Sequence, residues 1–398
     1  MKPPRSIFIL IWAVLILGAC TPFPQEEDSV EVIPYGIYPS ESGTYTVVAQ
    51  KSRYERETYD YVDSLLFIRI DTSGSVLQTR GIALESRPYL ERVFHLNNGN
   101  IMLYGALDNS YYYYTFSLRE LSLEGESVWS MQMPDRTYGV SPALNGDLFL
   151  FGWKYIGQDE YLSYSRIDRS GDTLWARTLP KIYNEQIDSG DPTSDNGCLA
   201  LGSLWFQDRS TDMLAVKVDA DGDTLWAVTC GGDRFDRISF STELDDGSYL
   251  LAGELNLYDS TNTDWSLNSG QQVYLVKVSA GGETLWTRAV GISLRESPNA
   301  LIEAANGDLV LTGTRDESYA YLYDEVTGWV SRLNPSGTER WLKEFPARLP
   351  LNLWELPSGE FIFVTKNLSE GYYVSSPDLS VIKLSPSGTV VWDRTLTP

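Results

Sequence analysis

A hairpin motif recurs seven times in the chain. Residues 217–226 read KVDADGDTLW, in which the Asp-Gly pair is typical of a two-residue hairpin turn and Trp226 lies on the returning strand. The turn glycine recurs at intervals of 46 to 60 residues, at Gly74, Gly125, Gly171, Gly222, Gly282, Gly337 and Gly388. Four residues after six of these glycines stands a tryptophan: Trp129, Trp175, Trp226, Trp286, Trp341 and Trp392. The first copy has Gln78 at that position instead.

A second glycine turn alternates strictly with the first. Its clearest copies read NNGNIMLYG, LNGDLFLFG, DDGSYLLAG and ANGDLVLTG, and its glycines are Gly43, Gly99, Gly146, Gly197, Gly247, Gly307 and Gly359. Each repeat therefore predicts two hairpins, or four antiparallel strands, A to D. Such repeats are typical of propeller blades, which bury both faces of each sheet against neighbours. We expect residues 33–398 to form an all-β, seven-bladed β-propeller with four antiparallel strands per blade.

The six repeated tryptophans are expected to be structural, each docking between neighbouring blades, with ligand contact as the alternative. The sequence leaves open how the last blade meets the first. Either the seventh repeat packs directly on the first, or a strand near residues 30–38 pairs differently.

The N-terminus indicates a secreted, lipid-anchored protein. Lys2 and Arg5 precede an apolar run at residues 7–17, which is too short for an ordinary membrane span and is typical of a signal peptide. The following Leu-Gly-Ala-Cys resembles the bacterial lipoprotein processing box. The resemblance implies a signal peptide over residues 1–19 and a lipid on Cys20, while an ordinary signal peptide with a chance cysteine is the alternative.

The residues around the expected cleavage site suggest a location. Residues 20–32 follow as an acidic, Pro-rich tether. Thr21, rather than an aspartate, follows Cys20, which by the same resemblance favours the outer membrane of the bacterial cell envelope.

The charge of the chain excludes some partners. Its 31 Lys and Arg face 54 Asp and Glu, a formal net charge of -23. Nucleic acid is disfavoured because phosphate binding needs clustered cations, and direct adsorption to anionic lipid is disfavoured likewise. We therefore expect no nucleic-acid partner and a membrane contact only through the lipid.

Few residues suggest catalysis. The single histidine, His95, is expected to be structural, which argues against histidine triads and three-histidine zinc sites. Asp219, Asp221 and Asp223 lack the glycine and glutamate of a calcium loop and predict a surface hairpin. We predict no catalytic residue, metal or cofactor, although carboxylates from different blades could still form a glycosidase site.

The last two cysteines, Cys198 and Cys230, are placed by the repeat on the second and fourth strands of one blade. These strands are separated by a third, so the cysteines are too far apart for a disulfide and are expected to be separate thiols.

The candidate ligand face is formed by the B–C connections, which are long and rich in aromatic and acidic residues. Long loops on a rigid scaffold are where binding sites usually lie, and aromatics beside carboxylates suit protein hot spots, sugars or cationic ligands. The alternative is that these aromatics only pack the loops down. The candidate residues are Trp153, Tyr155, Trp205, Tyr258, Trp265, Tyr321 and Tyr323.

The two motifs alternate along nearly the whole mature chain: one has Asp-Gly before a strand, and the other has Leu-Trp after a glycine turn. This alternation resembles that of bacterial secreted propeller-repeat proteins. The glycine-to-tryptophan spacing also resembles the docking motif of quinoprotein dehydrogenase-like propellers. Those proteins have eight blades, a vicinal disulfide and a calcium site, and their acid stands four residues before the glycine. Here Asp71, Asp168 and Asp219 stand three before it, so the resemblance extends to blade packing only.

The propeller lipoprotein of the outer-membrane β-barrel assembly machinery is also similar in outline, being lipid-anchored with docking tryptophans and eight blades. This resemblance implies an envelope scaffold. We therefore expect a non-enzymatic envelope lipoprotein that binds a protein partner through the long-loop face. The alternative is a carbohydrate-binding or carbohydrate-cleaving propeller that uses the same face.

Overall fold

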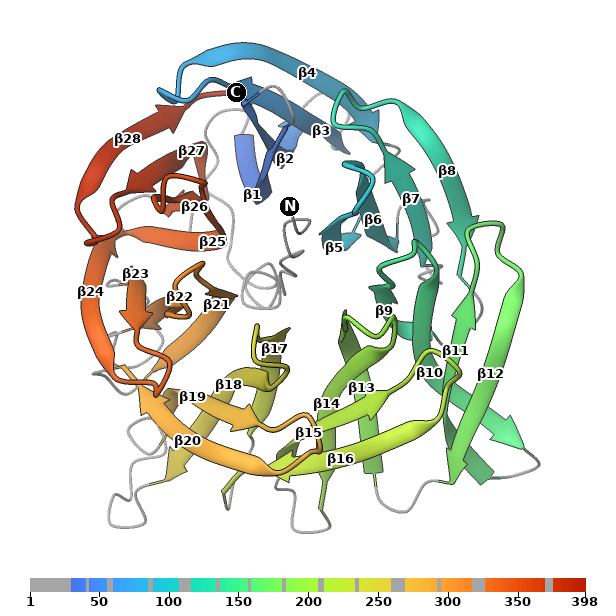
Figure 1. Ribbon diagram of the computed structural model, residues 1–398. Helices are drawn as coiled ribbons and strands as arrows, with labels where there is room; N and C mark the ends of the chain where they lie inside the picture. Colours follow the sequence, from blue (N-terminus) through green and yellow to red (C-terminus); the bar gives the residue numbers. More distant parts are fainter. Residues whose placement is uncertain are drawn as a thin grey trace. The chain divides into compact units, whose positions relative to one another are not determined.

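The computed structural model describes residues 30–40, 43–55, 60–84, 89–106, 116–133, 137–156, 159–180, 184–206, 211–232, 236–258, 269–291, 295–316, 326–368 and 375–398. Within these ranges every regular element is a β-strand. The strands form seven antiparallel sheets, each made of four consecutive strands in chain order (Figure 1). The expected fold, a seven-bladed β-propeller with four strands per blade, is confirmed.

Each blade takes its strands from one sequence repeat. The strands of blades 1 to 3 are β1 (Val30–Pro39), β2 (Tyr45–Glu55), β3 (Asp60–Ile70), β4 (Val76–Leu84), β5 (Tyr89–His95), β6 (Ile101–Ala106), β7 (Ser117–Leu121), β8 (Ser127–Gln132), β9 (Thr137–Pro142), β10 (Leu148–Ile156), β11 (Asp159–Ile167) and β12 (Thr173–Pro180). β1 thus begins at Val30, shortly before the expected start of the propeller.

The later blades follow the same plan. The strands of blades 4 and 5 are β13 (Asn184–Pro192), β14 (Cys198–Trp205), β15 (Thr211–Val218), β16 (Thr224–Cys230), β17 (Arg237–Glu243), β18 (Tyr249–Tyr258), β19 (Ser269–Val278) and β20 (Thr284–Val290). Those of blades 6 and 7 are β21 (Glu296–Glu303), β22 (Leu309–Asp316), β23 (Val326–Leu333), β24 (Glu339–Pro346), β25 (Arg348–Glu355), β26 (Phe361–Leu368), β27 (Ser375–Leu384) and β28 (Val390–Leu396).

The described residues fall into two compact units. One is Met133–Glu303, which contains blades 3, 4 and 5. The other contains blades 1, 2 and 7 with strands β22 to β24, and combines the described residues up to Gln132 with Ala304–Pro398.

The repeated turns are three-residue loops, and the expectation of two-residue loops is wrong. In blade 4, the Gly222 amide donates to the Asp219 carbonyl at 3.2 Å and the Asp219 amide donates to the Asp223 carbonyl at 3.0 Å. Gly222 has φ 87°, in the left-handed region that glycine adopts most readily. This is a type I turn closed by a glycine bulge, so Asp221-Gly222 form its second and third loop positions.

The A–B turn of blade 4 departs from the predicted glycine pattern. Asn196, at φ 64°, takes the left-handed position that was assigned to Gly197, whereas every other predicted turn glycine has a positive φ. Asparagine tolerates this conformation better than most residues because its short side chain bonds locally. The prediction for Gly197 was therefore wrong by one residue.

The acid three residues before a turn glycine caps the turn. Asp219 Oδ1 accepts the backbone N–H of Asp221 at 3.0 Å and of Asp223 at 2.8 Å. Residues 219–223 therefore form a surface hairpin, as expected. At the equivalent Asp71 and Asp168, hydrogen bonds from a serine hydroxyl and then from backbone amides lower the carboxyl pKa.

Separate apolar cores hold neighbouring blades together. Along β14, Cys198 and Ala200 face the cluster shared with Phe149 and Phe151 of blade 3. Leu199 and Leu201 face the opposite cluster, shared with blade 5. Because successive side chains of a strand point to opposite faces, a continuously apolar second strand fits a sheet buried on both sides.

Four of the repeated tryptophans bond to the next blade, and two of them, Trp175 and Trp226, lie at the rims of these cores. Trp175 Nε1 donates to the carbonyl of Ala220 at 2.8 Å, and Trp226 Nε1 donates to that of Ala280 at 2.9 Å. The same bond joins Trp341 to Pro386 and Trp392 to Thr72, at 3.2 Å each. In each case the acceptor stands two residues before a C–D turn glycine.

Those glycines are required because the indole ring lies directly on them. A Cβ added to Gly222 would lie 2.9 Å from the Trp175 ring, and one added to Gly282 would lie 2.7 Å from Trp226. A real Cβ does not approach a ring carbon so closely. The glycine therefore provides both the left-handed turn and the flat seat for the preceding blade's indole.

Blade 7 packs directly on blade 1, which decides between the two alternatives left open by the sequence. β1 pairs with β2 in its own sheet. Besides the bond from Trp392, Lys366 Nζ of blade 7 lies 3.1 Å from Glu31, and Lys51 Nζ donates to the carbonyl of Pro398 at 2.6 Å.

We predict that Gly282 and Trp226 are energetically coupled. Trp226→Ala should lower the free energy of unfolding by about 2 to 3 kcal/mol, below the usual 3 to 5 because the indole is half-buried. Gly282→Ala should cost about 1 to 2 kcal/mol for the left-handed backbone and more for the collision with the ring. The double variant should therefore be more stable than the sum of the single losses implies, by about 1 kcal/mol in chemical denaturation.

Gly99→Ala is the matched control. Gly99 has a similar φ of 82°, but a Cβ added there would meet no atom within 4 Å. Its loss should add to that of Trp226→Ala. Additivity for Gly282→Ala as well would show that the indole does not restrict that glycine.

Candidate functional site

Of the predicted ligand face, the structure places Trp205 most clearly. Trp205 ends β14 at the B–C end of blade 4 and is 41% exposed, and the adjacent Phe206 is 36% exposed. Trp153 and Tyr155 lie in β10 and Tyr258 ends β18, but their side chains fall outside the described part of the structure. Trp265, Tyr321 and Tyr323 lie wholly outside the described residues.

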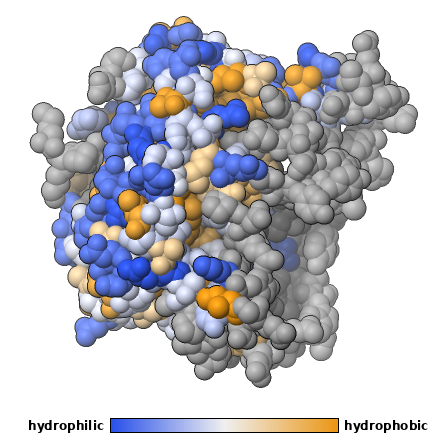
Figure 2. Space-filling view, turned by 90° about the vertical axis from the view of Figure 1, so that its right-hand side faces the viewer, coloured by the Kyte–Doolittle hydropathy of each residue, from blue (hydrophilic) through white to orange (hydrophobic). Residues whose placement is uncertain are grey.

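A set of exposed aliphatic residues was not anticipated. Each stands three residues after a C–D turn glycine, on the fourth strand of its blade: Leu77, Val128, Leu174, Leu225, Leu285 and Val391. On the face shown in Figure 2, apolar residues form small separate groups among hydrophilic ones. Single exposed aliphatics of this kind are common on soluble proteins and by themselves indicate no binding site.

His95 is placed inside an aromatic cluster. Its ring stacks on Tyr38, with centroids 5.2 Å apart, and meets Trp354 edge-on at 5.6 Å. Its Nε2 is buried with no hydrogen-bond partner, and burial lowers the pKa of the imidazole to about 4. The neutral, enclosed imidazole packs between aromatic rings of blades 1 and 7 and is poorly placed for proton transfer with a substrate.

Both described cysteines are free thiols. Cys198 opens β14 and is buried, and Cys230 ends β16. Burial raises the pKa of both, to about 11 for Cys230, so neither is an activated nucleophile. Cys20 lies outside the described residues.

The described residues contain neither a metal-binding cluster nor a membrane-spanning helix. No group of three or more His, Cys, Asp or Glu in that part of the chain could hold a metal ion. Within the same ranges, no helix has the length and apolar character needed to cross a membrane.

In five blades a mostly buried cation, opposite the repeated tryptophan on the neighbouring strand, forms an ion pair. The cation stands five residues before the C–D turn glycine and meets a carboxylate of the A–B turn. The pairs are Arg166–Asp147 at 2.9 Å, Lys217–Asp195 at 2.7 Å, Lys277–Asp246 at 2.8 Å, Arg332–Asp308 at 2.8 Å and Lys383–Glu360 at 2.6 Å. The Lys383 hydrogen bond lowers the pKa of Glu360. Each cation is thus neutralised within its own blade.

Blade 1 lacks the tryptophan, and the structure describes no carboxylate paired with its cation; Glu41, two residues before the turn glycine Gly43, lies outside the described residues. Arg69 takes the cation position and pairs across the sheet with Gln78, the residue that replaces the tryptophan. The residues on either side of the A–B turn glycine are Ser42 and Thr44, neither of which is acidic. The Arg69 side chain is exposed and forms no ion pair with any residue that the structure describes.

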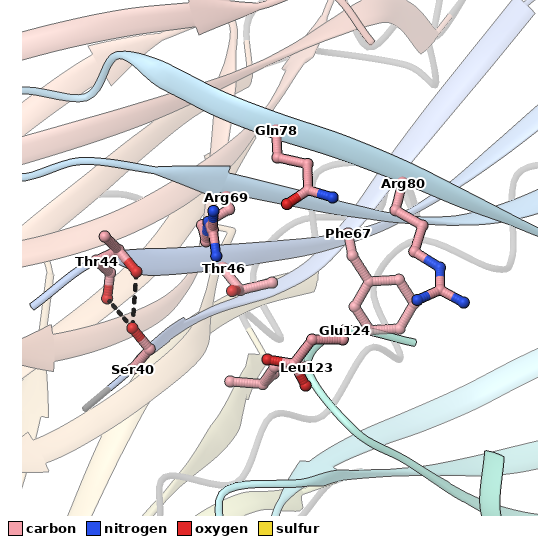
Figure 3. A pocket seen from close by; sticks show the side chains of 9 residues that line it. All are labelled: Ser40, Thr44, Thr46, Phe67, Arg69, Gln78, Arg80, Leu123 and Glu124. Atoms are coloured by element: carbon pink, nitrogen blue, oxygen red, sulfur yellow. Dashed lines mark hydrogen bonds between the residues drawn. The ribbon is translucent and has the colours of Figure 1, made fainter. Parts of the chain in front are cut away.

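A hollow of about 190 Å³ lies beside Gln78, between blade 1 and the C–D turn of blade 2 (Figure 3). Gln78 and Arg80 of β4 line one side of it, and Leu123 and Glu124 of the blade 2 turn line the other. Phe67, only 3% exposed, forms an apolar wall. The remaining lining residues are Ser40, Thr44, Thr46 and Arg69. The sequence signals this site only through Gln78, the one break in the tryptophan series.

No family model matches the chain. No curated protein matches it in sequence. Among solved structures, a mutant of the Synechocystis apocarotenoid oxygenase and an ACO/RPE65 chimera are similar, each with a TM-score of 0.50, 10% identity and coverage of 94% of both chains. A eukaryotic initiation factor has a TM-score of 0.44 and 10% identity, covering 99% of this chain and 96% of its own. At such identity the likeness extends to the fold alone.

We predict that His95 makes the protein less stable in acid. Burial lowers the pKa of His95 from 6.5 to about 4, so between these values the unfolded chain binds a proton that the folded chain does not. The free energy of unfolding is therefore highest above pH 6.5 and falls as the pH drops towards 4. The total loss is about 3 kcal/mol.

His95→Phe keeps an aromatic ring on Tyr38 but cannot titrate. Urea unfolding at pH 7 and pH 4.5 should show the wild type losing about 2 to 3 kcal/mol more than this variant. Carboxylates contribute equally to the pH dependence of the wild type and of His95→Phe. Equal losses of unfolding free energy in the two proteins would therefore contradict the placement of a neutral, buried imidazole.

Proposed function

We propose that the protein is a non-enzymatic, lipid-anchored propeller of the bacterial cell envelope that binds a protein partner through its long-loop face. The observation that carries the proposal is the exposed aromatic pair Trp205-Phe206 at the B–C end of blade 4. Adjacent exposed aromatics on a rigid strand end present large contact area at little entropic cost, as binding hot spots do.

The titratable groups support a binding role over catalysis. His95 is enclosed in an aromatic cluster, and the thiols of Cys198 and Cys230 have raised pKa values. The five lysines and arginines opposite the repeated tryptophans neutralise turn carboxylates of their own blades. These groups hold blades together, which leaves the loop face for recognition.

The anchor and the envelope location rest on the N-terminal sequence. Lys2 and Arg5, the apolar run at residues 7–17 and Leu-Gly-Ala-Cys before the expected tether support acylation of Cys20. Growth with an alkyne-tagged fatty acid should label the wild type and leave Cys20→Ala unlabelled.

Affinity capture from gently solubilised envelopes tests the binding role. The lipidated wild type should retain a protein in stoichiometric amount, and Trp205→Ser combined with Phe206→Ser should lose it because the apolar anchors are gone. Leu225→Ser is the matched control, since Leu225 is 55% exposed on β16, away from the loop end of its blade.

Capture that survives the Trp205→Ser/Phe206→Ser variant would contradict the proposed face. Recovery of the bait without any partner would contradict the protein-binding role and favour the glycan alternative. Circular dichroism of each variant separates loss of binding from loss of fold.

A further inference from the structure

The junction between blades 1 and 2 keeps the residues that receive a docking tryptophan but contributes no tryptophan of its own. We propose that the hollow there binds a tryptophan side chain that a protein partner supplies together with a neighbouring carboxylate. This site is separate from the long-loop face, because it lies beside the short C–D turn of blade 2.

The junction between blades 3 and 4 shows what the complete arrangement contains. The Trp175 indole lies on Gly222 and donates to the Ala220 carbonyl. The Arg177 guanidinium lies over the indole, 5.7 Å from its centroid. Beneath them, Arg166 pairs with a turn carboxylate. The complete junction therefore has an aromatic ring, a carbonyl acceptor, an arginine over the ring and a neutralised cation.

Blade 1 retains the equivalent arginine. Arg80, like Arg177, stands six residues after its turn glycine, and in blade 5 the equivalent Arg288 lies 5.8 Å from the centre of the Trp286 ring. Arg80 instead pairs with Glu126 at 2.9 Å, with both side chains largely exposed. A solvent-exposed ion pair of this kind is weak, so a ring entering the hollow can gain a cation–π contact at little cost.

The turn of blade 2 retains the seat and the acceptor. Gly125 has φ 82°, as the other turn glycines do, but a Cβ added to it would lie 2.7 Å from Ile82 and 3.2 Å from Phe67. These side chains cover Gly125 where an indole lies elsewhere, so an incoming ring has to displace the Ile82 side chain to lie on the glycine. The two hydrogen bonds of this turn use the carbonyls of Ser122 and Glu126. The Leu123 carbonyl, which is equivalent to that of Ala220, is not used by them and can accept an indole N–H.

The size of the hollow limits what enters it. Its volume of about 190 Å³ is below the roughly 300 to 1,000 Å³ of typical small-molecule sites. It suits a single aromatic side chain against the Phe67 wall, with the main chain of the ligand outside. One ring gives little affinity by itself, so useful binding requires further contacts along a segment, which favours a protein over a free metabolite.

The charged side chains around the hollow favour an acidic residue next to the tryptophan of the partner. Five equivalents of Arg69 meet a carboxylate of their own blade, while Arg69 has Thr44 beside its turn glycine. Among the described residues Arg69 has no such partner, and a carboxylate next to the incoming tryptophan would supply one. Glu124 at the opposite rim repels an anion there, so the acid must lie on the Arg69 side.

Fluorescence anisotropy with short labelled peptides on the full-length protein in detergent tests the proposal. A peptide containing Glu-Trp should bind about fivefold more tightly than its Lys-Trp counterpart, because of Arg69. Replacing the tryptophan by alanine should weaken binding by about tenfold or more. Equal binding of the three peptides would overturn the proposal.

Two variants assign the binding to the hollow. Gln78→Trp should fill the hollow from within, abolish peptide binding and raise the melting temperature. Arg69→Gln should remove the preference for Glu-Trp over Lys-Trp. Arg53→Gln should keep it, because Arg53 lies near the end of β2, whereas Arg69 of β3 pairs with Thr46 near the start of that strand, and because Arg53 is paired with Glu55. Unchanged preference in Arg69→Gln would overturn the assignment even if Gln78→Trp fails to fold.

Indole-3-acetate distinguishes the two sources of an aromatic acid. Weak binding of this small acid beside tight binding of the Glu-Trp peptide supports a protein partner. Binding of indole-3-acetate as tight as that of the peptide would overturn the protein partner and indicate a metabolite site. Because neither Trp205 nor Phe206 takes part, failure here leaves the loop-face proposal intact.

Discussion

The contact on which the blades depend is the indole of one blade lying on a turn glycine of the next. The contact combines an N–H···O bond, such as that from Trp226 to Ala280, with a ring seated where no Cβ fits. Because the indoles of Trp175 and Trp226 also pack against an apolar core between two sheets, they join local turn geometry to long-range packing. The same contact occurs between blades 7 and 1, where Trp392 reaches Thr72.

This arrangement explains why no strand needs to be exchanged between the ends of the chain. Each sheet is built from four consecutive strands, and β1 stays with β2. The join between the last and first blades is made through side chains: Trp392, Lys366 and Lys51 form bonds across it, and Asn352 of blade 7 accepts the backbone N–H of Ile37 in blade 1. Side-chain contacts thus close the propeller, a role that a sheet shared between the two ends of the chain could otherwise have.

The fold was predictable because its signals are local. Strand alternation, positive-φ glycines and the tryptophan spacing each depend on a few adjacent residues. Two details of the turns were predicted wrongly. Asn196, and not Gly197, takes the left-handed position in blade 4, and a glycine bulge makes the loops one residue longer than expected. The hollow was harder to predict from the sequence. Gln78 marks only one side of it, and the other side is formed by the turn of a neighbouring blade that contains Leu123 and Gly125.

The central claim is that a turn glycine and the carbonyl two residues before it receive an indole, as at the four described junctions, and that the turn of blade 2 can do the same once a ring displaces Ile82 from Gly125. A crystal structure of Gln78→Trp tests this most directly. The account predicts an indole inside the hollow, beneath Arg80, with its Nε1 as close to the Leu123 carbonyl as the 2.8 to 3.2 Å of the other junctions. An indole turned out to solvent above an unfilled hollow would contradict it.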